Sequence, residues 1–153
     1  MINPFNSPLE VGMRVLVILT EFFPEYLDIN RLVLFDYALL YSSDFDGPES
    51  SQLSLPNHAD RANRLGGFGV KRQHIMNGLR LMIRAELVEV GSSEYDGITY
   101  QAGEDAENFL SLLKSEYLHE LRNNAHWVGE KFTGIDDSQL QEYMQQIFSS
   151  WFG

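Results

Sequence analysis

The pattern of apolar and polar positions predicts a mainly helical chain. Residues 9–23 carry apolar side chains at helical spacing. Ser7 can cap the free backbone N–H groups at the start of this helix, and Pro24 ends it. Asp28 can cap a second helix over residues 29–43, which is apolar on nearly every side. A helix with that pattern is expected at the centre of the core.

The rest of the chain predicts a third helix, a β-hairpin and two further helices. The third helix covers residues 70–85. Strand-forming residues at 86–90 and 98–102 then flank a turn that contains Asp-Gly, which is a hairpin signal. Helical periodicity returns over residues 103–125 and 138–152.

These elements together predict a mainly α fold with a β-hairpin, in the α+β class. Three helices followed by a two-stranded wing are typical of a winged-helix-like core over residues 1–103. Residues 104–153 would then be a C-terminal helical extension of the same domain. A four-helix bundle with an inserted hairpin is the competing architecture. Residues 43–69 have no period and are predicted as a long loop, a feature that usually signals function or disorder.

Length and composition narrow the class of protein. A chain of 153 residues fits one domain, and it has no cysteine, which excludes disulfides and thiolate metal sites. The N-terminus lacks the basic and apolar regions of a signal peptide, and the longest apolar stretch is too short to span a bilayer. We therefore expect a soluble, cytoplasmic protein with no membrane partner. The net charge of −11 argues against indiscriminate binding to nucleic acid or anionic lipid.

Positive charge is concentrated in one segment of this acidic chain. Residues 61–84 contain six basic residues and no acidic one, whereas the other 129 residues hold five basic and 22 acidic residues. At about 100° per residue, Gln73, Asn77, Arg80 and Arg84 fall within an arc of roughly 60° on the third helix, opposite its apolar residues. The candidate residues for binding DNA or a partner protein are Arg61, Arg64, Lys71, Arg72, Gln73, Asn77, Arg80 and Arg84.

Two interpretations of this basic segment stay open. Gln, Asn and Arg can bond to base edges in a major groove, where a helix-turn-helix protein places the helix that precedes the wing, and the remaining cations can contact phosphates. Alternatively, the segment contacts an acidic protein or acidic parts of its own chain. The predicted hairpin favours the second interpretation, because residues 85–113 contain seven carboxylates and no Lys or Arg, so a DNA backbone would repel it.

The last helix and the remaining polar residues add two expectations. Phe148, Trp151 and Phe152 lie on the apolar face of the last helix and are candidates for hydrophobic contact with a partner. Asp36 stands in an otherwise apolar helix, where it is either a buried acid with a shifted pKa or, as we expect, a residue that reaches solvent or caps a neighbour. We find no catalytic constellation, and we expect no enzyme, no cofactor and no metal.

Three stretches carry a resemblance to a known family: "NPFNSPLEVGMR", "FPEYLDINRLVLFDYALLYSSD" and "GLRLMIRAELVEV". They resemble the small middle-component proteins of prokaryotic ABC-ATPase three-component conflict systems. The likeness covers about residues 3–90 and does not reach the last third of the chain. The family has no catalytic motif, so the resemblance transfers no active-site residue.

The resemblance implies a winged-helix-like adaptor without catalysis of its own, acting in defence against phage or plasmids. Its partners would be an ABC or SMC-like ATPase and an effector subunit. Relatives of such proteins resemble the dimeric winged-helix subunits that accompany SMC ATPases. The apolar last helix leaves a homodimer open, and the polar stripe of the third helix leaves open a contact with DNA through residues 70–85. The alternative function is a winged-helix transcription regulator that binds DNA.

Overall fold

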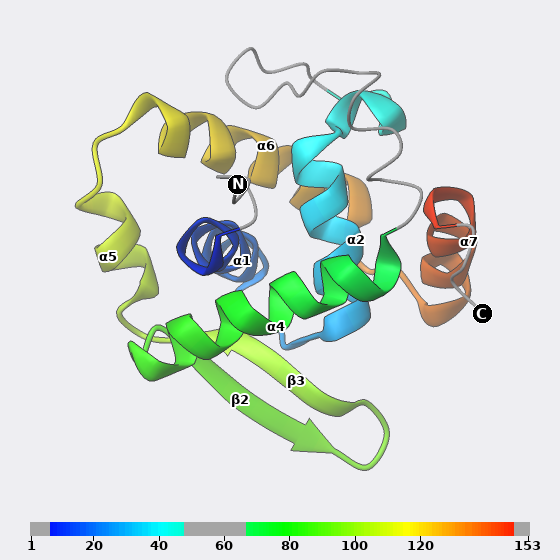
Figure 1. Ribbon diagram of the computed structural model, residues 1–153, viewed down its shortest axis with the longest axis horizontal. Helices are drawn as coiled ribbons and strands as arrows, with labels where there is room; N and C mark the ends of the chain where they lie inside the picture. Colours follow the sequence, from blue (N-terminus) through cyan, green and yellow to red (C-terminus); the bar gives the residue numbers. More distant parts are fainter. Residues whose placement is uncertain (1–6, 48–66, 149–153) are drawn as a thin grey trace.

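The computed structural model describes residues 7–47 and 67–148 and shows a mainly helical protein with a small antiparallel sheet at one edge (Figure 1). The elements are, in chain order, α1 (Pro8–Phe22), β1 (Leu27–Asp28), α2 (Ile29–Leu40), the 3₁₀ helix η2 (Ser42–Phe45), α4 (Phe68–Arg84), β2 (Val88–Ser93), β3 (Gly97–Ala102), α5 (Ala106–Ser111), α6 (Glu116–Phe132) and α7 (Asp137–Ile147).

Helices α1, α2 and α4 form the centre of the molecule, and their buried side chains make one continuous hydrophobic core. Helix α1, seen end-on in Figure 1, crosses α4 at very short range. A Cβ atom added to Gly78 of α4 would lie 2.7 Å from the backbone nitrogen of Gly12 of α1, closer than real Cβ contacts allow. Glycine at both positions therefore permits this crossing.

The two predicted helix caps are confirmed. The Ser7 hydroxyl accepts a hydrogen bond from the Glu10 backbone N–H at 3.2 Å, at the start of α1. Asp28 accepts one from the Arg31 backbone N–H at 2.8 Å, at the start of α2. Each cap satisfies an N–H group that the first helical turn leaves without a partner.

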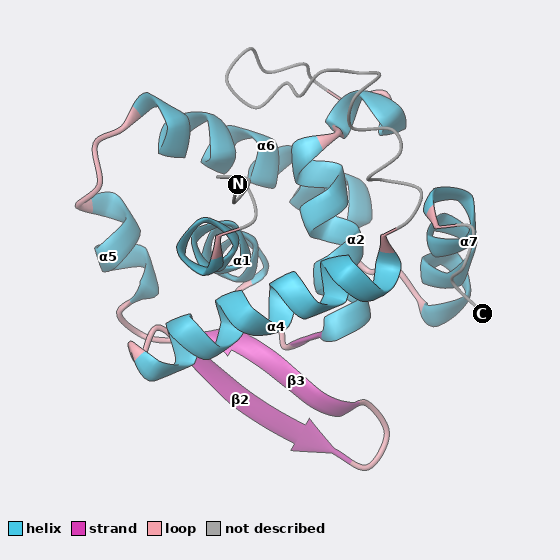
Figure 2. Ribbon diagram, in the orientation of Figure 1, coloured by secondary structure: helices cyan, strands magenta, loops and turns pink. Residues whose placement is uncertain are grey.

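The predicted hairpin is also confirmed, but it belongs to a three-stranded sheet in the order β1-β3-β2 (Figure 2). Strand β2 pairs with β3 along its whole length, and Gly97, with φ of +70°, follows the turn between them. The short strand β1 pairs on the other side of β3, with Leu27 opposite Tyr100. The sequence pattern did not predict β1, because two residues are too few to show alternation.

The C-terminal part differs from prediction in two places. The single helix expected over residues 103–125 is instead α5 and α6, separated by a short connection in which Ser115 caps α6 through the Leu118 N–H. Phe148, expected on a partner surface, is 1% exposed and packs against the rings of Tyr37 and Phe68. It is buried because α7 lies with its apolar face on α2 rather than facing solvent.

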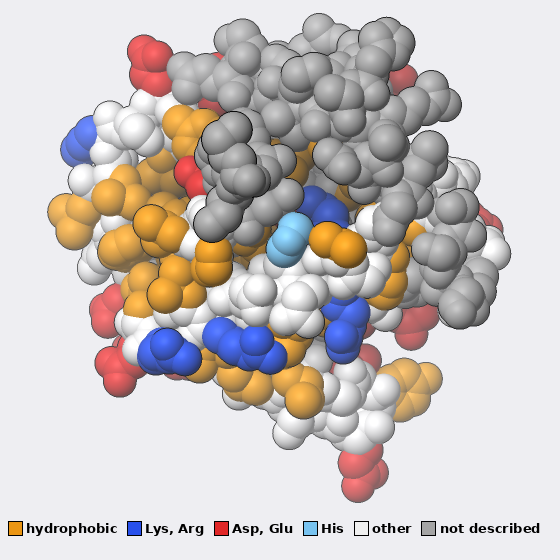
Figure 3. Space-filling view, viewed as in Figure 1, with side chains coloured by type: hydrophobic (Ala, Val, Ile, Leu, Met, Phe, Trp, Pro, Cys, Tyr) orange, Lys and Arg blue, Asp and Glu red, His pale blue; other side chains and the backbone are white. Residues whose placement is uncertain are grey.

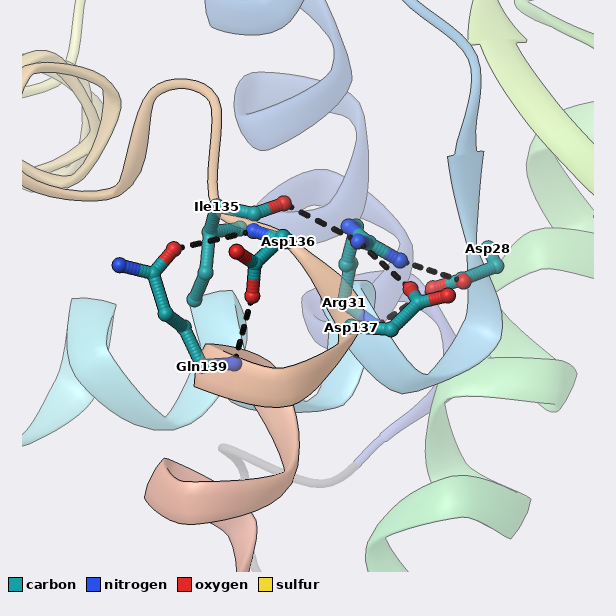
Figure 4. Close-up of polar contacts among 6 residues, drawn as sticks. All are labelled: Asp28, Arg31, Ile135, Asp136, Asp137 and Gln139. Atoms are coloured by element: carbon teal, nitrogen blue, oxygen red, sulfur yellow. Dashed lines mark hydrogen bonds and ion pairs between the residues drawn. The ribbon is translucent and has the colours of Figure 1, made fainter.

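Arg31 joins the C-terminal helix to the core (Figure 4). Its guanidinium donates to Asp28 at 2.8 Å, to Asp137 at 2.9 Å and to the Ile135 carbonyl at 3.0 Å. Asp136 and Gln139 form a reciprocal capping box at the start of α7. These contacts fix the first turn of α7 beside the start of α2.

Two further expectations concern the long loop and the membrane. Of the predicted loop over residues 43–69, the structure places Ser42–Phe45 in η2 and begins α4 at Phe68, while residues 48–66 lie outside the described part. Among the described residues, no helix has the length and apolar character needed to cross a membrane.

Candidate binding surface on helix α4 and the hairpin

The inner side of α4 is anchored by a buried ionic cluster of Arg14 from α1, Asp36 from α2 and Lys71 from α4. The Arg14 guanidinium donates to both carboxylate oxygens of Asp36, at 2.7 and 3.3 Å. The Lys71 ammonium lies 2.6 Å from the same carboxylate. The side chains of Arg14 and Asp36 are each only 1% exposed, so the cluster joins three helices inside the core.

The cluster shifts the pKa values of its members. Burial alone would raise the pKa of the Asp36 carboxyl, but Arg14 and then Lys71 more than offset it and lower the pKa below its usual range. Burial lowers the pKa of Lys71, and Asp36 opposes that change only in part. Our expectation that Asp36 reaches solvent or caps a neighbour was wrong, because the carboxylate finds two cations within the core.

Lys71 is therefore set apart from the other predicted binding residues. Its side chain is 16% exposed and its charge is directed at Asp36. A phosphate or a partner carboxylate would have to compete with a buried counter-ion for this ammonium. Lys71 acts in this structure as an anchor of α4.

The outer side of α4 presents the other predicted residues that the structure describes. Arg72, Gln73, Arg80 and Arg84 are exposed, and Asn77 is partly exposed between them. The Asn77 side-chain oxygen accepts hydrogen bonds from Gln73 and from Arg80, both at 3.1 Å. Figure 3 shows the basic side chains in a row over α4, on the side next to the hairpin.

The hairpin adds an apolar strip to this surface. The register pairs Val90 with Tyr100 and Ser92 with Ile98, so Val90, Tyr100 and Ile98 share one face of the sheet. Tyr100 is buried, but Val90 is 52% and Ile98 is 61% exposed. Burial raises the pKa of the Tyr100 hydroxyl, and the positive charges of Arg72 and Arg80 oppose that rise. Figure 3 shows hydrophobic side chains directly beside the row of basic side chains on α4.

We call the surface formed by Arg72, Gln73, Asn77, Arg80, Arg84, Val90 and Ile98 the α4–hairpin face. The carboxylates of the hairpin lie elsewhere. Glu89 alternates onto the opposite face of β2, and Glu94 and Asp96 are exposed in the turn. The described surface is thus basic and apolar on one side of the hairpin and acidic on its other side and tip.

Sequence reasoning missed Val90 and Ile98. The signal was present, since alternate residues of both strands are apolar and the Asp-Gly turn predicts their pairing. Of the remaining predicted site residues, Arg61, Arg64, Trp151 and Phe152 lie outside the described residues. Within residues 7–47 and 67–148, no group of three potential metal ligands comes together.

The family model described as "ABC-three component (ABC-3C) system Middle Component 2" matches residues 4–153 of the chain. The chain belongs to this family. Membership confirms the resemblance that the N-terminal stretches carry, and it extends that resemblance through the last third of the chain. No match was found among curated proteins or among solved structures.

Membership of the ABC-3C Middle Component 2 family gives the exposed surface a context. A component of a three-component ABC system has other subunits as partners. For this family member, the α4–hairpin face is a part of the described surface where three arginines without a described carboxylate partner lie beside exposed aliphatic side chains.

Proposed function

We propose that the protein is a non-catalytic adaptor subunit that links an ABC or SMC-like ATPase to an effector in a prokaryotic defence complex. The observation that carries this proposal is the separation of charge around the hairpin in a member of the Middle Component 2 family. An adaptor needs two distinct contact surfaces. The α4–hairpin face is basic and apolar, whereas Glu89, Glu94 and Asp96 give the back and tip of the hairpin the opposite charge.

Co-expression of the three subunits of its system tests the adaptor role. We expect the chain to elute with the ATPase and with the effector on size-exclusion chromatography, and the ATPase and effector to elute separately when the chain is omitted. Equal ATP hydrolysis by the ATPase alone and by the pair would support a role without catalysis. Separate elution of all three subunits, at concentrations near those in the cell, would contradict the adaptor.

A winged-helix protein that binds DNA is the second candidate. It is supported by the order of the elements, in which α4 precedes the hairpin and β1 completes a three-stranded sheet. The exposed Gln73, Arg80 and Arg84 and the partly exposed Asn77 are residue types that read base edges. The exposed carboxylates of the hairpin count against it, because a wing along the DNA backbone would be repelled.

The salt dependence of binding separates this candidate from the adaptor. With three phosphate contacts, the affinity for a promoter fragment should fall with a log–log slope of about −2.7. The double variant Arg80→Glu/Arg84→Glu should abolish that binding. A slope near zero, or unchanged binding by the variant, would exclude sequence recognition through α4.

A further inference from the structure

The α4–hairpin face combines charges that the described part of the protein leaves unneutralised. Arg14, Arg31, Lys71 and Arg122 each pair with a carboxylate. No carboxylate of the described residues is paired with Arg72, Arg80 or Arg84, although the chain has twice as many acidic as basic residues. The three arginines extend over about 18 Å of α4, at 1.5 Å of rise per residue.

The same face exposes aliphatic surface directly beside those charges. Val90 and Ile98 lie on the side of the sheet that holds Tyr100, and the row of basic side chains on α4 borders hydrophobic side chains on the hairpin side (Figure 3). Met76 and Ile83 of α4 are partly buried between the arginines and the core. An exposed aliphatic strip gains free energy only from a partner that covers it with apolar surface.

Nucleic acid does not fit this combination well. A phosphate backbone would pair with the arginines but would leave Val90 and Ile98 uncovered, and it would approach Glu94 and Asp96 in the turn. Arginine is instead enriched in protein interfaces, whose fully buried centre is more apolar than the rest of the protein surface.

We propose that the α4–hairpin face binds an acidic segment of another subunit of the ABC-3C system, one that carries aliphatic or aromatic side chains beside its carboxylates. The carboxylates pair with Arg72, Arg80 and Arg84, and the apolar side chains cover Val90 and Ile98. This inference rests on the proposed adaptor function and names the chemistry of one of its two contacts.

Binding of the full-length chain to the purified ATPase and effector, each measured by calorimetry, tests the proposal. The double variant Arg80→Glu/Arg84→Glu should weaken binding to one of the two subunits at least about 100-fold. Ile98→Asp should weaken the same binding at least about 10-fold. The control is Lys114→Glu/Lys131→Glu, which changes the net charge equally at two exposed positions outside this face. It should change the affinity less than about 3-fold.

A photo-crosslinking residue at position 98 identifies the chemistry of the partner. Ile98→p-benzoylphenylalanine in the assembled complex should capture a peptide rich in Asp and Glu. Capture of a basic peptide or of DNA would overturn the proposal, as would equal losses of affinity in the arginine pair and the lysine pair. Circular dichroism at increasing temperature should show that every variant remains folded.

The outcomes separate this inference from the function on which it rests. If the wild-type chain binds neither subunit, the adaptor function fails. If it binds a subunit and Arg80→Glu/Arg84→Glu binds equally well, the adaptor function stands and the α4–hairpin face is not the contact.

Discussion

Two consecutive cations on α4 have opposite surroundings. The Lys71 ammonium lies 2.6 Å from the buried carboxylate of Asp36, and its side chain is 16% exposed. Arg72 is exposed and is paired with no carboxylate of the described residues. A helix turns by about 100° per residue, so one step along the chain separates the side of α4 that faces the core from the side that borders the hairpin.

The comparison shows how this domain divides its charges between stability and binding. A charge inside the core must be paired, because desolvation costs several kcal/mol per ion. An exposed arginine remains hydrated and costs little, so its charge stays available to a partner. Changes on the inner side of α4 should therefore alter stability, and changes on its outer side should alter binding.

The largest effect is expected from breaking the buried cluster. Asp36→Asn would leave Arg14 and Lys71 in the core without a counter-charge and should lower the free energy of unfolding by about 3–5 kcal/mol. Urea denaturation measures this change. The matched outer-side control, Arg72→Gln, should stay within about 0.5 kcal/mol of wild type. Equal losses of stability in the two variants would show that the inner and outer sides of α4 do not differ in this way.

The buried cluster should also make the free energy of unfolding depend on pH. The pKa of Asp36 is lowered in the folded protein, so its stabilising contribution is present above the unfolded value of 3.8 and is lost as pH falls toward the folded value. The difference in unfolding free energy between wild type and Asp36→Asn should be constant near neutral pH and shrink below about pH 4. Urea midpoints from pH 7 to pH 2.5 measure it. A difference that grows in acid would contradict this assignment.

A steric change on the inner side should have a smaller effect. Gly78→Ala would place a methyl group 2.7 Å from the Gly12 backbone nitrogen and should cost about 1–3 kcal/mol as α1 and α4 move apart. Gly69, on the same helix, has no neighbour within 4 Å of an added Cβ atom. Gly69→Ala should therefore stabilise α4 by about 0.5–1 kcal/mol. Thermal unfolding compares the two, and the same sign in both would argue against a close crossing.

Removal of the partly buried side chain of Arg31 should cost less unfolding free energy than removal of the Asp36 charge. Arg31→Ala removes the contacts to Asp28, Asp137 and the Ile135 carbonyl, and because Asp137 is largely exposed, solvent screening reduces the loss to about 1 kcal/mol. Hydrogen exchange should become faster in α7 and stay unchanged in α4. Faster exchange across the whole protein would mean that Arg31 supports the core and not only the C-terminal helix.

Local signals made much of the fold predictable. Ser7, Asp28 and the Asp-Gly turn act within a few residues of where they stand, so α1, α2 and the hairpin could be read from the sequence. The break between α5 and α6 carried such a signal too, in the cap at Ser115, but apolar periodicity across the break concealed it.

Contacts between residues far apart in the sequence could not be predicted from such local signals. Asp36 meets a lysine 35 positions later and an arginine 22 positions earlier, and no local pattern pairs them. The pattern likewise marked Phe148 as apolar without showing that Tyr37 and Phe68 cover it. The basic stripe on α4 could be predicted because helical spacing alone separates it from the side that faces the core. Val90 and Ile98 could not be assigned to the same surface, because their place beside α4 depends on the position of the hairpin.

Asp28 connects three parts of the molecule through a single side chain and its backbone. As a residue of β1 it pairs with Thr99, as a cap it begins α2, and through Arg31 it reaches the first turn of α7. A displacement of β3 by a bound subunit would thus reach the first turn of α7 through Asp28, Arg31 and Asp137, beside the direct packing of α7 on α2.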